Sequence, residues 1–121
     1  RLLLCSGKLY YELEERRDQE GRHDVGLLRL EQLYPLAEDD LRHALAPYRP
    51  DVPLIWVQEE PRNMGAWPYL QTQGQLHARV LAQHRFFGIT RRAAAVPATG
   101  SNAAHKLEQK QLIDQAFGPL A

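Results

Sequence analysis

The chain has 121 residues, and its 15 Lys and Arg residues balance its 15 Asp and Glu residues, so the formal net charge is zero. This length suits one domain with a hydrophobic core, and the charge balance excludes a bulk field that would favour nucleic acid or an anionic membrane. A single cysteine, Cys5, excludes an internal disulfide and a cysteine-based metal cluster. No apolar segment reaches the length of a membrane span, and no signal-peptide pattern is present.

The first strand is predicted at Arg1–Ser6, where four consecutive apolar residues precede the turn Ser6-Gly7. The chain enters this strand without an initiator methionine, so we expect it to be part of a longer polypeptide. A helix is predicted from about Lys8, with apolar side chains at helical spacing, and Gly21 is its natural C-terminal end.

The second strand is predicted at Val25–Leu30 and contains a charged residue, Arg29. Burying this guanidinium without a partner would cost several kcal/mol, so Arg29 should lie at the strand end or pair with a carboxylate. A second helix is predicted from Ala37 to about Pro47. Three acidic residues in its first turn suit the positive end of the helix dipole.

The stretch from Val52 to Trp67 is the part of the sequence around which the rest is organised. Its apolar run Leu54–Val57 is typical of a strand that is buried on both faces. The polar residues Gln58–Glu60 are expected to end that strand, and Pro61 to stop its ladder of donors. Asn63–Gly65 is expected to turn the chain toward a new helix.

This third helix is predicted at Ala66–Gln83, where Gly74 weakens the helix by roughly 1 kcal/mol relative to alanine. A last strand is predicted at Arg85–Thr90, and a polar loop connects it to a closing helix at Asn102–Phe117. Ser101 is predicted to cap the closing helix with its side chain.

Strands that alternate with helices predict a single α/β domain over residues 1–121, with a parallel sheet, helices on both faces and right-handed crossovers. Ligands and partners dock beyond the carboxyl ends of the strands in such sheets. At the carboxyl end of the third strand, we predict that Glu60 accepts amide donors of the third helix and that Asn63 caps this helix. Trp67 is predicted to be largely buried. A solvated strand end with a cap is the alternative interpretation.

The sequence contains few patterns that carry catalytic chemistry. It has no G-x-G-x-x-G fingerprint and no P-loop, which excludes both common phosphate cradles. None of its five histidines stands in a metal-binding spacing, so we predict no catalytic residue and no metal site. The cationic residues Lys8, Arg29, Arg91 and Arg92 are candidates for binding a phosphate or carboxylate, with a solvated surface role as the alternative.

Four separated segments of the chain read LLLCSGKLYYEL, LLRLEQLYPL, WVQEEPRNMGAW and RRAAAVPATGSNAAHKLEQ. In this order, between Arg1 and Phe117, they closely resemble the C-terminal region of the first component of 2-oxoglutarate dehydrogenase, which is the thiamine-diphosphate-dependent decarboxylating subunit. The paired glutamates before a glycine-containing helix start also resemble the C-terminal domain of the transketolase superfamily.

The resemblance implies a three-layer α/β/α domain with a five-stranded, mostly parallel mixed sheet that contains one antiparallel strand. Because the sequence predicts four strands, we expect the first strand of the full domain to precede Arg1. In the family, this domain builds the homodimer and walls the neighbourhood of the active site. The residues expected in that wall or dimer interface are Glu59, Glu60, Asn63, Gly65 and Trp67.

The resemblance also implies the parent reaction, which is oxidative decarboxylation of 2-oxoglutarate with succinyl transfer to a lipoyl acyltransferase, a step of the tricarboxylic acid cycle. The family holds thiamine diphosphate and Mg²⁺ with motifs on earlier domains. Those motifs are absent here, so this chain is expected neither to bind the cofactor nor to catalyse the reaction alone.

We expect a location in the bacterial cytoplasm, or in the mitochondrial matrix of a eukaryote, and no nucleic-acid or membrane partner. The alternatives are a regulatory module that binds acyl-coenzyme A or a nucleotide, and a sibling 2-oxoacid dehydrogenase.

Overall fold

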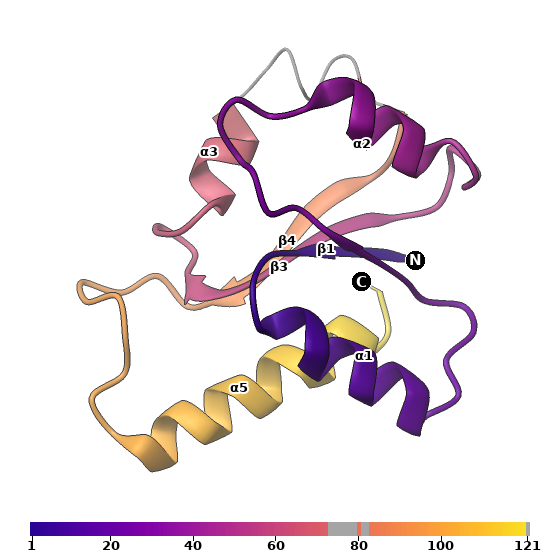
Figure 1. Cartoon of the computed structure of the whole chain (residues 1–121). Helices are drawn as coiled ribbons and strands as arrows, with labels where there is room; N and C mark the ends of the chain where they lie inside the picture. Colours follow the sequence, from indigo (N-terminus) through magenta and orange to yellow (C-terminus); the bar gives the residue numbers. More distant parts are fainter. Residues whose placement is uncertain (73–79, 81–82, 121) are drawn as a thin grey trace.

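A parallel sheet with the strand order β2-β1-β3-β4 forms the centre of the computed structural model, which describes residues 1–72, 80 and 83–120 (Figure 1). Its strands are β1 (Leu2–Cys5), β2 (Gly26–Arg29), β3 (Leu54–Pro61) and β4 (Phe86–Arg91). The helices of this described part are α1 (Leu9–Gln19), α2 (Glu38–Leu45), α3 (Trp67–Thr72) and α5 (Asn102–Phe117). Every strand pair is parallel, which confirms the predicted α/β class.

The helices cover both faces of the sheet and give three layers. Helices α1 and α5 pack on one face, and α2 and α3 pack on the other (Figure 1). Strand β3 divides its apolar run between the two layers, because successive side chains point to opposite faces. Leu54 and Trp56 join the core beneath α2 and α3, whereas Ile55 and Val57 join the core beneath α1 and α5. All four are at most 1% exposed, so the prediction of a strand buried on both faces is confirmed.

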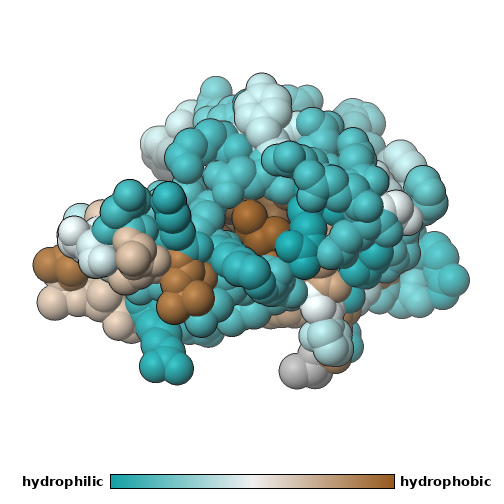
Figure 2. All heavy atoms as spheres, turned by 90° about the horizontal axis from the view of Figure 1, so that it is seen from below, coloured by the Kyte–Doolittle hydropathy of each residue, from teal (hydrophilic) through white to brown (hydrophobic). Residues whose placement is uncertain are grey.

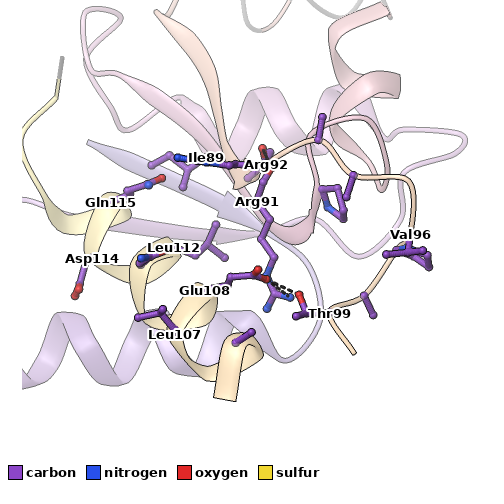
Figure 3. Close-up of a pocket in the computed structure, with 18 of the residues that line it drawn as sticks. Ile89, Arg91, Arg92, Val96, Thr99, Leu107, Glu108, Leu112, Asp114 and Gln115 are labelled. Carbon is purple, nitrogen blue, oxygen red and sulfur yellow. Dashed lines mark hydrogen bonds and ion pairs between the residues drawn. The ribbon is translucent and has the colours of Figure 1, made fainter. Parts of the chain in front are cut away.

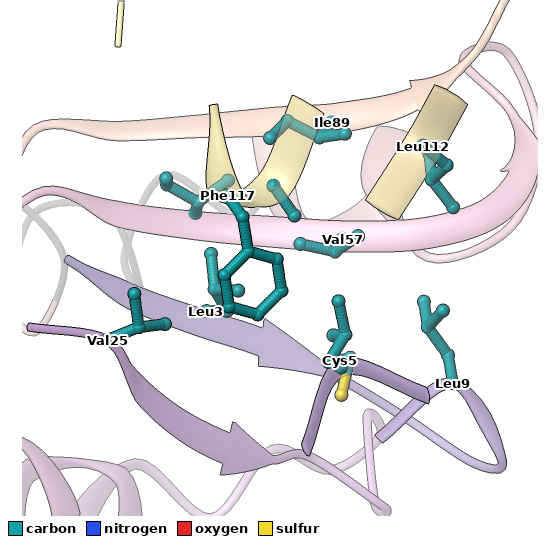
Figure 4. Packing of buried hydrophobic residues seen from close by; sticks show 11 residues of the cluster. Leu3, Cys5, Leu9, Val25, Val57, Ile89, Leu112 and Phe117 are labelled. Atoms are coloured by element: carbon teal, nitrogen blue, oxygen red, sulfur yellow. The ribbon is translucent and has the colours of Figure 1, made fainter. Parts of the chain in front are cut away.

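The core beneath α1 and α5 brings the two ends of the chain together (Figure 4). Leu3 and Cys5 of β1 pack in the same cluster as Leu112 and Phe117 of α5. The Arg1 guanidinium adds hydrogen bonds to the carbonyls of Ala116 and Gly118, at 2.9 and 2.7 Å. Outside this core, the face that carries α1 and α5 is mainly hydrophilic, with apolar residues gathered toward one end and in a central hollow (Figure 2).

The predicted end of the third strand was wrong, because β3 continues through the polar residues Gln58–Glu60 to Pro61. Its pairing with β4 is irregular between Val57 and Pro61 and resumes where Pro61 lies opposite Arg91. Proline is tolerated there because it lies at this irregularity of the pairing, where no ladder donor is required of it. The next backbone N–H, that of Arg62, donates to the Arg91 carbonyl at 3.0 Å and closes the pair.

The closing helix has the predicted bounds, and the Ser101 side chain accepts a hydrogen bond from the Ala104 backbone N–H at 3.4 Å. The predicted third helix is observed as α3 over Trp67–Thr72. Its predicted continuation, including Gly74, falls on residues 73–79 and 81–82, which lie outside the described residues. The fifth strand and the antiparallel strand that the resemblance implies stay predictions.

Candidate functional site

The carboxyl ends of the four described strands lie along one edge of the sheet, because all of them are parallel. The chain leaves β1 toward β2 on one side and meets β3 on the other, so the order of the strands reverses between β1 and β3. Open α/β sheets bind ligands and partners at such a point. The residues singled out from the sequence stand at or just beyond this edge: Lys8, Arg29, Glu59, Glu60, Asn63, Gly65, Trp67, Arg91 and Arg92.

Gln58 is the polar centre of this edge, although the sequence singled out its neighbours. Its side chain is 3% exposed, and its Oε1 accepts hydrogen bonds from the Trp56 indole N–H at 2.9 Å and the Trp67 backbone N–H at 2.8 Å. Its Nε2 donates to the carbonyls of Pro61 at 3.2 Å and Met64 at 2.7 Å. One buried amide therefore joins the end of β3 to the start of α3.

A signal for this role was present in the sequence. Gln58 follows Trp56 by two residues, so both side chains point to the same face of the strand. A buried indole N–H usually has an acceptor, and Gln58 was the nearest polar side chain on that face.

Asn63 does not cap α3, so that prediction was wrong. Its side chain instead forms two hydrogen bonds with the backbone of Ala94, donating from Nδ2 to the carbonyl and accepting from the N–H at Oδ1, each at 3.0 Å. The Trp67 N–H that needed an acceptor is already bonded to Gln58. Asn63 therefore fastens the turn after β3 to the loop after β4.

Glu60 is exposed and receives no amide donor of α3, so its predicted role as an acceptor for this helix was also wrong. It lies on the face opposite Glu59, because the two are adjacent strand residues. Glu59 forms an ion pair with Lys8, with 3.0 Å between Nζ and Oε1, across the point where the strand order reverses. This hydrogen bond raises the pKa of Lys8.

Gly65 is required at its position in the turn. Its φ angle is +67°, a left-handed backbone conformation that residues other than glycine rarely adopt. A Cβ atom there would also lie 3.0 Å from the Nε2 of Gln58 and 3.0 Å from the Cβ of Glu60. The glycine therefore lets the turn close onto the buried amide.

Trp67 is 3% exposed, which confirms its predicted burial. Its ring lies against Gly88 of β4, where an added Cβ would be 2.7 Å from ring carbons. The ring also meets Phe86 at a centroid distance of 5.5 Å and has the Arg62 guanidinium 5.8 Å from its centroid. Trp67 thus fastens the start of α3 to the sheet.

Arg29 ends β2 and is paired, as predicted. Its Nε donates to Glu31 Oε1 at 2.9 Å, and its guanidinium lies 5.1 and 5.4 Å from the ring centroids of Tyr10 and Tyr11. Glu31 also accepts from the Gly7 backbone N–H at 3.1 Å, so it connects the ends of β1 and β2. The pKa of Glu31 is lowered, first by the bond from Arg29 and then by that from Gly7.

Arg91 connects β4 to α5 (Figure 3). Its side chain is 9% exposed and donates to Gln109 Oε1 at 3.0 Å and to His105 Nδ1 at 3.2 Å. It forms an ion pair with Glu108 at 3.4 Å, and Glu108 accepts a second bond from the Thr99 hydroxyl at 2.6 Å. Arg92, by contrast, is exposed.

The four candidate cations therefore do not converge on one anion site. Lys8, Arg29 and Arg91 each have an internal carboxylate partner. Arg92 alone of these four has no partner within the described residues. Their proposed role as effector contacts stays a prediction.

A groove of about 1270 Å³ lies between β4, the loop 92–100 and α5 (Figure 3). Its apolar lining includes Phe87, Ile89 and Leu112, together with Val96 and Leu107, which are 59% and 57% exposed. Exposed apolar side chains that gather around a groove are typical of an interaction surface.

Within the described ranges, no three His, Cys, Asp or Glu side chains are placed to hold a metal ion. Cys5 is fully buried, and this burial raises the pKa of its thiol to about 12, so it is unsuited to nucleophilic chemistry. Across the same part of the chain, no helix has the length and apolar character needed to cross a membrane.

Comparison with known proteins gives consistent matches. Residues 1–117 match the family model described as 2-oxoglutarate dehydrogenase C-terminal. The chain is 49% identical over 121 residues to the multifunctional 2-oxoglutarate metabolism enzyme of Mycolicibacterium vanbaalenii, covering 98% of this chain and 9% of that protein. It is 42% identical over 118 residues to the 2-oxoglutarate dehydrogenase E1 component of Azotobacter vinelandii, covering 97% and 12%.

A third relative is the 2-oxoglutarate dehydrogenase E1/E2 component of Corynebacterium glutamicum, which is 40% identical over 117 residues, covering 97% of this chain and 9% of that protein. The chain thus spans about a tenth of the length of these curated relatives.

Proposed function

Because the chain belongs to the family of 2-oxoglutarate dehydrogenase C-terminal regions, we propose that it is the assembly and active-site-supporting domain of a 2-oxoglutarate dehydrogenase. The whole enzyme would carry out oxidative decarboxylation of 2-oxoglutarate and transfer the succinyl group to a lipoyl acyltransferase. The observation that carries this proposal is the Gln58 junction. The amide oxygen and nitrogen of Gln58 both form hydrogen bonds that hold β3, α3 and the turn between them together.

Thiamine diphosphate and Mg²⁺ would be bound by other parts of the enzyme. A diphosphate-bound Mg²⁺ takes oxygen ligands in octahedral geometry. The described residues offer no group of three or more acidic or metal-binding side chains for it, and the carboxylates at the sheet edge are paired with cations or stand alone. The residues present do not fit the cofactor, and we derive no catalytic step from them.

We propose a homodimer, with this domain at or near the interface, and the lipoyl acyltransferase as a partner of the assembled enzyme. The groove beside β4 supports an interface, because Val96 and Leu107 expose apolar surface at its rim. β4 is an outer strand of the described sheet, so its second edge is open to pairing. The bacterial relatives support a location in the bacterial cytoplasm.

A regulatory module for acyl-coenzyme A or a nucleotide is less well supported, because three of the four candidate cations are engaged by internal carboxylates. A sibling 2-oxoacid dehydrogenase is the second alternative, because the described residues provide no group that distinguishes one 2-oxoacid from another.

The proposal is tested in the full-length enzyme with Gln58→Leu and with a variant that lacks these 121 residues. We expect the deletion to abolish both 2-oxoglutarate decarboxylation and dimer sedimentation, and Gln58→Leu to weaken both in parallel. A deletion variant that remains dimeric and fully active would contradict the proposed role. Measuring decarboxylation with several 2-oxoacids separates this enzyme from a sibling.

A further inference from the structure

A second hollow lies at the point where the strand order reverses, on the face that carries α2 and α3. This switch-point crevice has a volume of about 370 Å³. Its polar lining comes from Ser6 after β1 and Glu60 at the end of β3, and its aromatic lining from Tyr34, Trp56 and Tyr69. Crevices at such a reversal are where open α/β sheets receive ligands and partners.

Glu60 is the charged group of this crevice. Its carboxylate has no ion-pair or hydrogen-bond partner within residues 1–72, 80 and 83–120. The neighbouring Glu59 is instead paired with Lys8 on the opposite face. Such a site attracts a cation in two ways. The carboxylate attracts it through its negative charge, and the aromatic rings attract it through their electron-rich faces.

The aromatic lining combines one fixed and one exposed side chain. Trp56 is 1% exposed and held by its bond to Gln58, so it provides a preformed apolar wall. Tyr34 is 82% exposed. Tyrosine has one polar and one apolar end, and it is enriched in interfaces, where the partner covers its ring.

We propose that this crevice receives a lysine side chain from a part of the same enzyme outside these 121 residues. The methylene stem would pack along the aromatic walls, and the ammonium would pair with Glu60. The relatives are roughly ten times as long as the part that this chain matches, so most of the polypeptide that can meet this edge lies beyond it. The inference rests on the proposed function and names a contact through which the domain supports the rest of the enzyme.

The test is zero-length coupling of the full-length enzyme with a water-soluble carbodiimide, followed by proteolysis and mass spectrometry. The reagent activates a carboxylate, and the amine of a contacting lysine displaces it to form an amide while the carbodiimide leaves as a urea. We expect an amide between Glu60 and a lysine outside residues 1–121. Glu60→Gln should lower its yield at least tenfold, and Glu59→Gln, the matched control, should leave it within twofold.

Labelling with glycinamide in the presence of carbodiimide provides the second measurement. In the assembled enzyme Glu60 should give little glycinamide adduct, because the contacting lysine amine captures the activated carboxylate before this small amine can reach it. The inference is overturned when Glu60 reacts with glycinamide as fast as an exposed carboxylate, when it couples only to the acyltransferase, or when its coupled lysine lies within this chain. Decarboxylation of 2-oxoglutarate by the same preparation is measured separately, so failure of the contact is distinguished from failure of the proposed function.

Discussion

The backbone N–H of Trp67 donates to the side-chain Oε1 of Gln58 at 2.8 Å, nine residues away in sequence. The same oxygen also accepts from the Trp56 indole. A strand end and a helix start are thus organised by one neutral amide, while the adjacent Glu59 pairs with Lys8 and the Glu60 carboxylate has no partner among the described residues.

This junction predicts a large cost for Gln58→Leu. The substitution leaves the Trp56 indole N–H, the Trp67 N–H and the Met64 carbonyl without their partner in a buried site. Each orphaned buried group costs about 1–3 kcal/mol, with partial relaxation, so we expect a loss of roughly 2–4 kcal/mol in the free energy of unfolding. Urea unfolding of the 121-residue chain measures it.

Glu60→Gln is the matched control for this substitution, because Glu60 lies two residues further along the same face of the strand and is exposed. Surface substitutions of this kind stay within about 0.5 kcal/mol. Equal stability of Gln58→Leu and Glu60→Gln would show that the buried amide is not the organising group.

Gly88 and Trp67 provide the second prediction. A Cβ at Gly88 would lie 2.7 Å from the Trp67 ring, so Gly88→Ala should overpack this contact and cost about 1–3 kcal/mol. Gly100→Ala is the control, since a Cβ there has no neighbour within 4 Å. Trp67→Ala should cost roughly 3–5 kcal/mol because it leaves a cavity.

Thermal unfolding of the single and double variants checks this pair. In the Trp67→Ala background, Gly88→Ala should lose most of its cost, because the ring that it meets is gone. Fully additive effects would contradict the packing seen between the two residues.

The sequence was a good guide to the elements whose local pattern agrees with their environment. The apolar run at Leu54–Val57 and the capped helix that begins after Ser101 were predicted correctly, because strand burial and helix capping leave signals within a few residues. The predicted end of β3 was wrong, because pairing with β4 resumes at Pro61, beyond the polar residues. That pairing joins segments about 30 residues apart and leaves no local signal.

The sheet edge at which the candidate residues stand follows from the predicted topology, whereas the partners of their side chains do not. Parallel topology places the carboxyl ends of the strands at one edge, and Lys8, Glu59 and Arg91 stand at or just beyond it. The cap was assigned to Asn63 by its residue type, whereas its actual partner, Ala94, comes from a distant loop. Which polar group satisfies which donor depends on tertiary contacts.

Acid should weaken the fold partly through Glu31. The pKa of Glu31 is lowered in the folded chain from an ordinary value of 4.5 by Arg29 and the Gly7 N–H. A depressed carboxyl pKa contributes stability above the unfolded value, and that contribution is lost as the pH falls through the folded value. Unfolding free energies measured between pH 7 and pH 2 should decline below about pH 4.5, and Glu31→Gln should make this decline shallower.

Salt separates this ion-pair effect from the general charging of the protein at low pH. Glu31 and Arg29 are solvent-exposed, so raising the salt concentration should shrink the difference between wild type and Glu31→Gln at pH 7. An identical acid decline in both proteins would show that Glu31 does not contribute.

Arg91 gives the last prediction, which concerns how α5 is fastened to the sheet. Its guanidinium reaches Glu108, Gln109 and His105 from the end of β4. Arg91→Ala removes these charged hydrogen bonds but leaves Glu108 its bond to Thr99. Because Glu108 is also partly solvated, we expect a loss of about 1–3 kcal/mol in the free energy of unfolding and faster hydrogen exchange in the first turns of α5.

Arg92→Ala removes a neighbouring, exposed guanidinium and should stay within about 0.5 kcal/mol. Lysine at position 91 keeps the charge but offers a single point donor, so Arg91→Lys should recover only part of the loss. If Arg91→Lys restores stability and exchange completely, the charge alone holds α5, and the three-way geometry of the guanidinium is not needed.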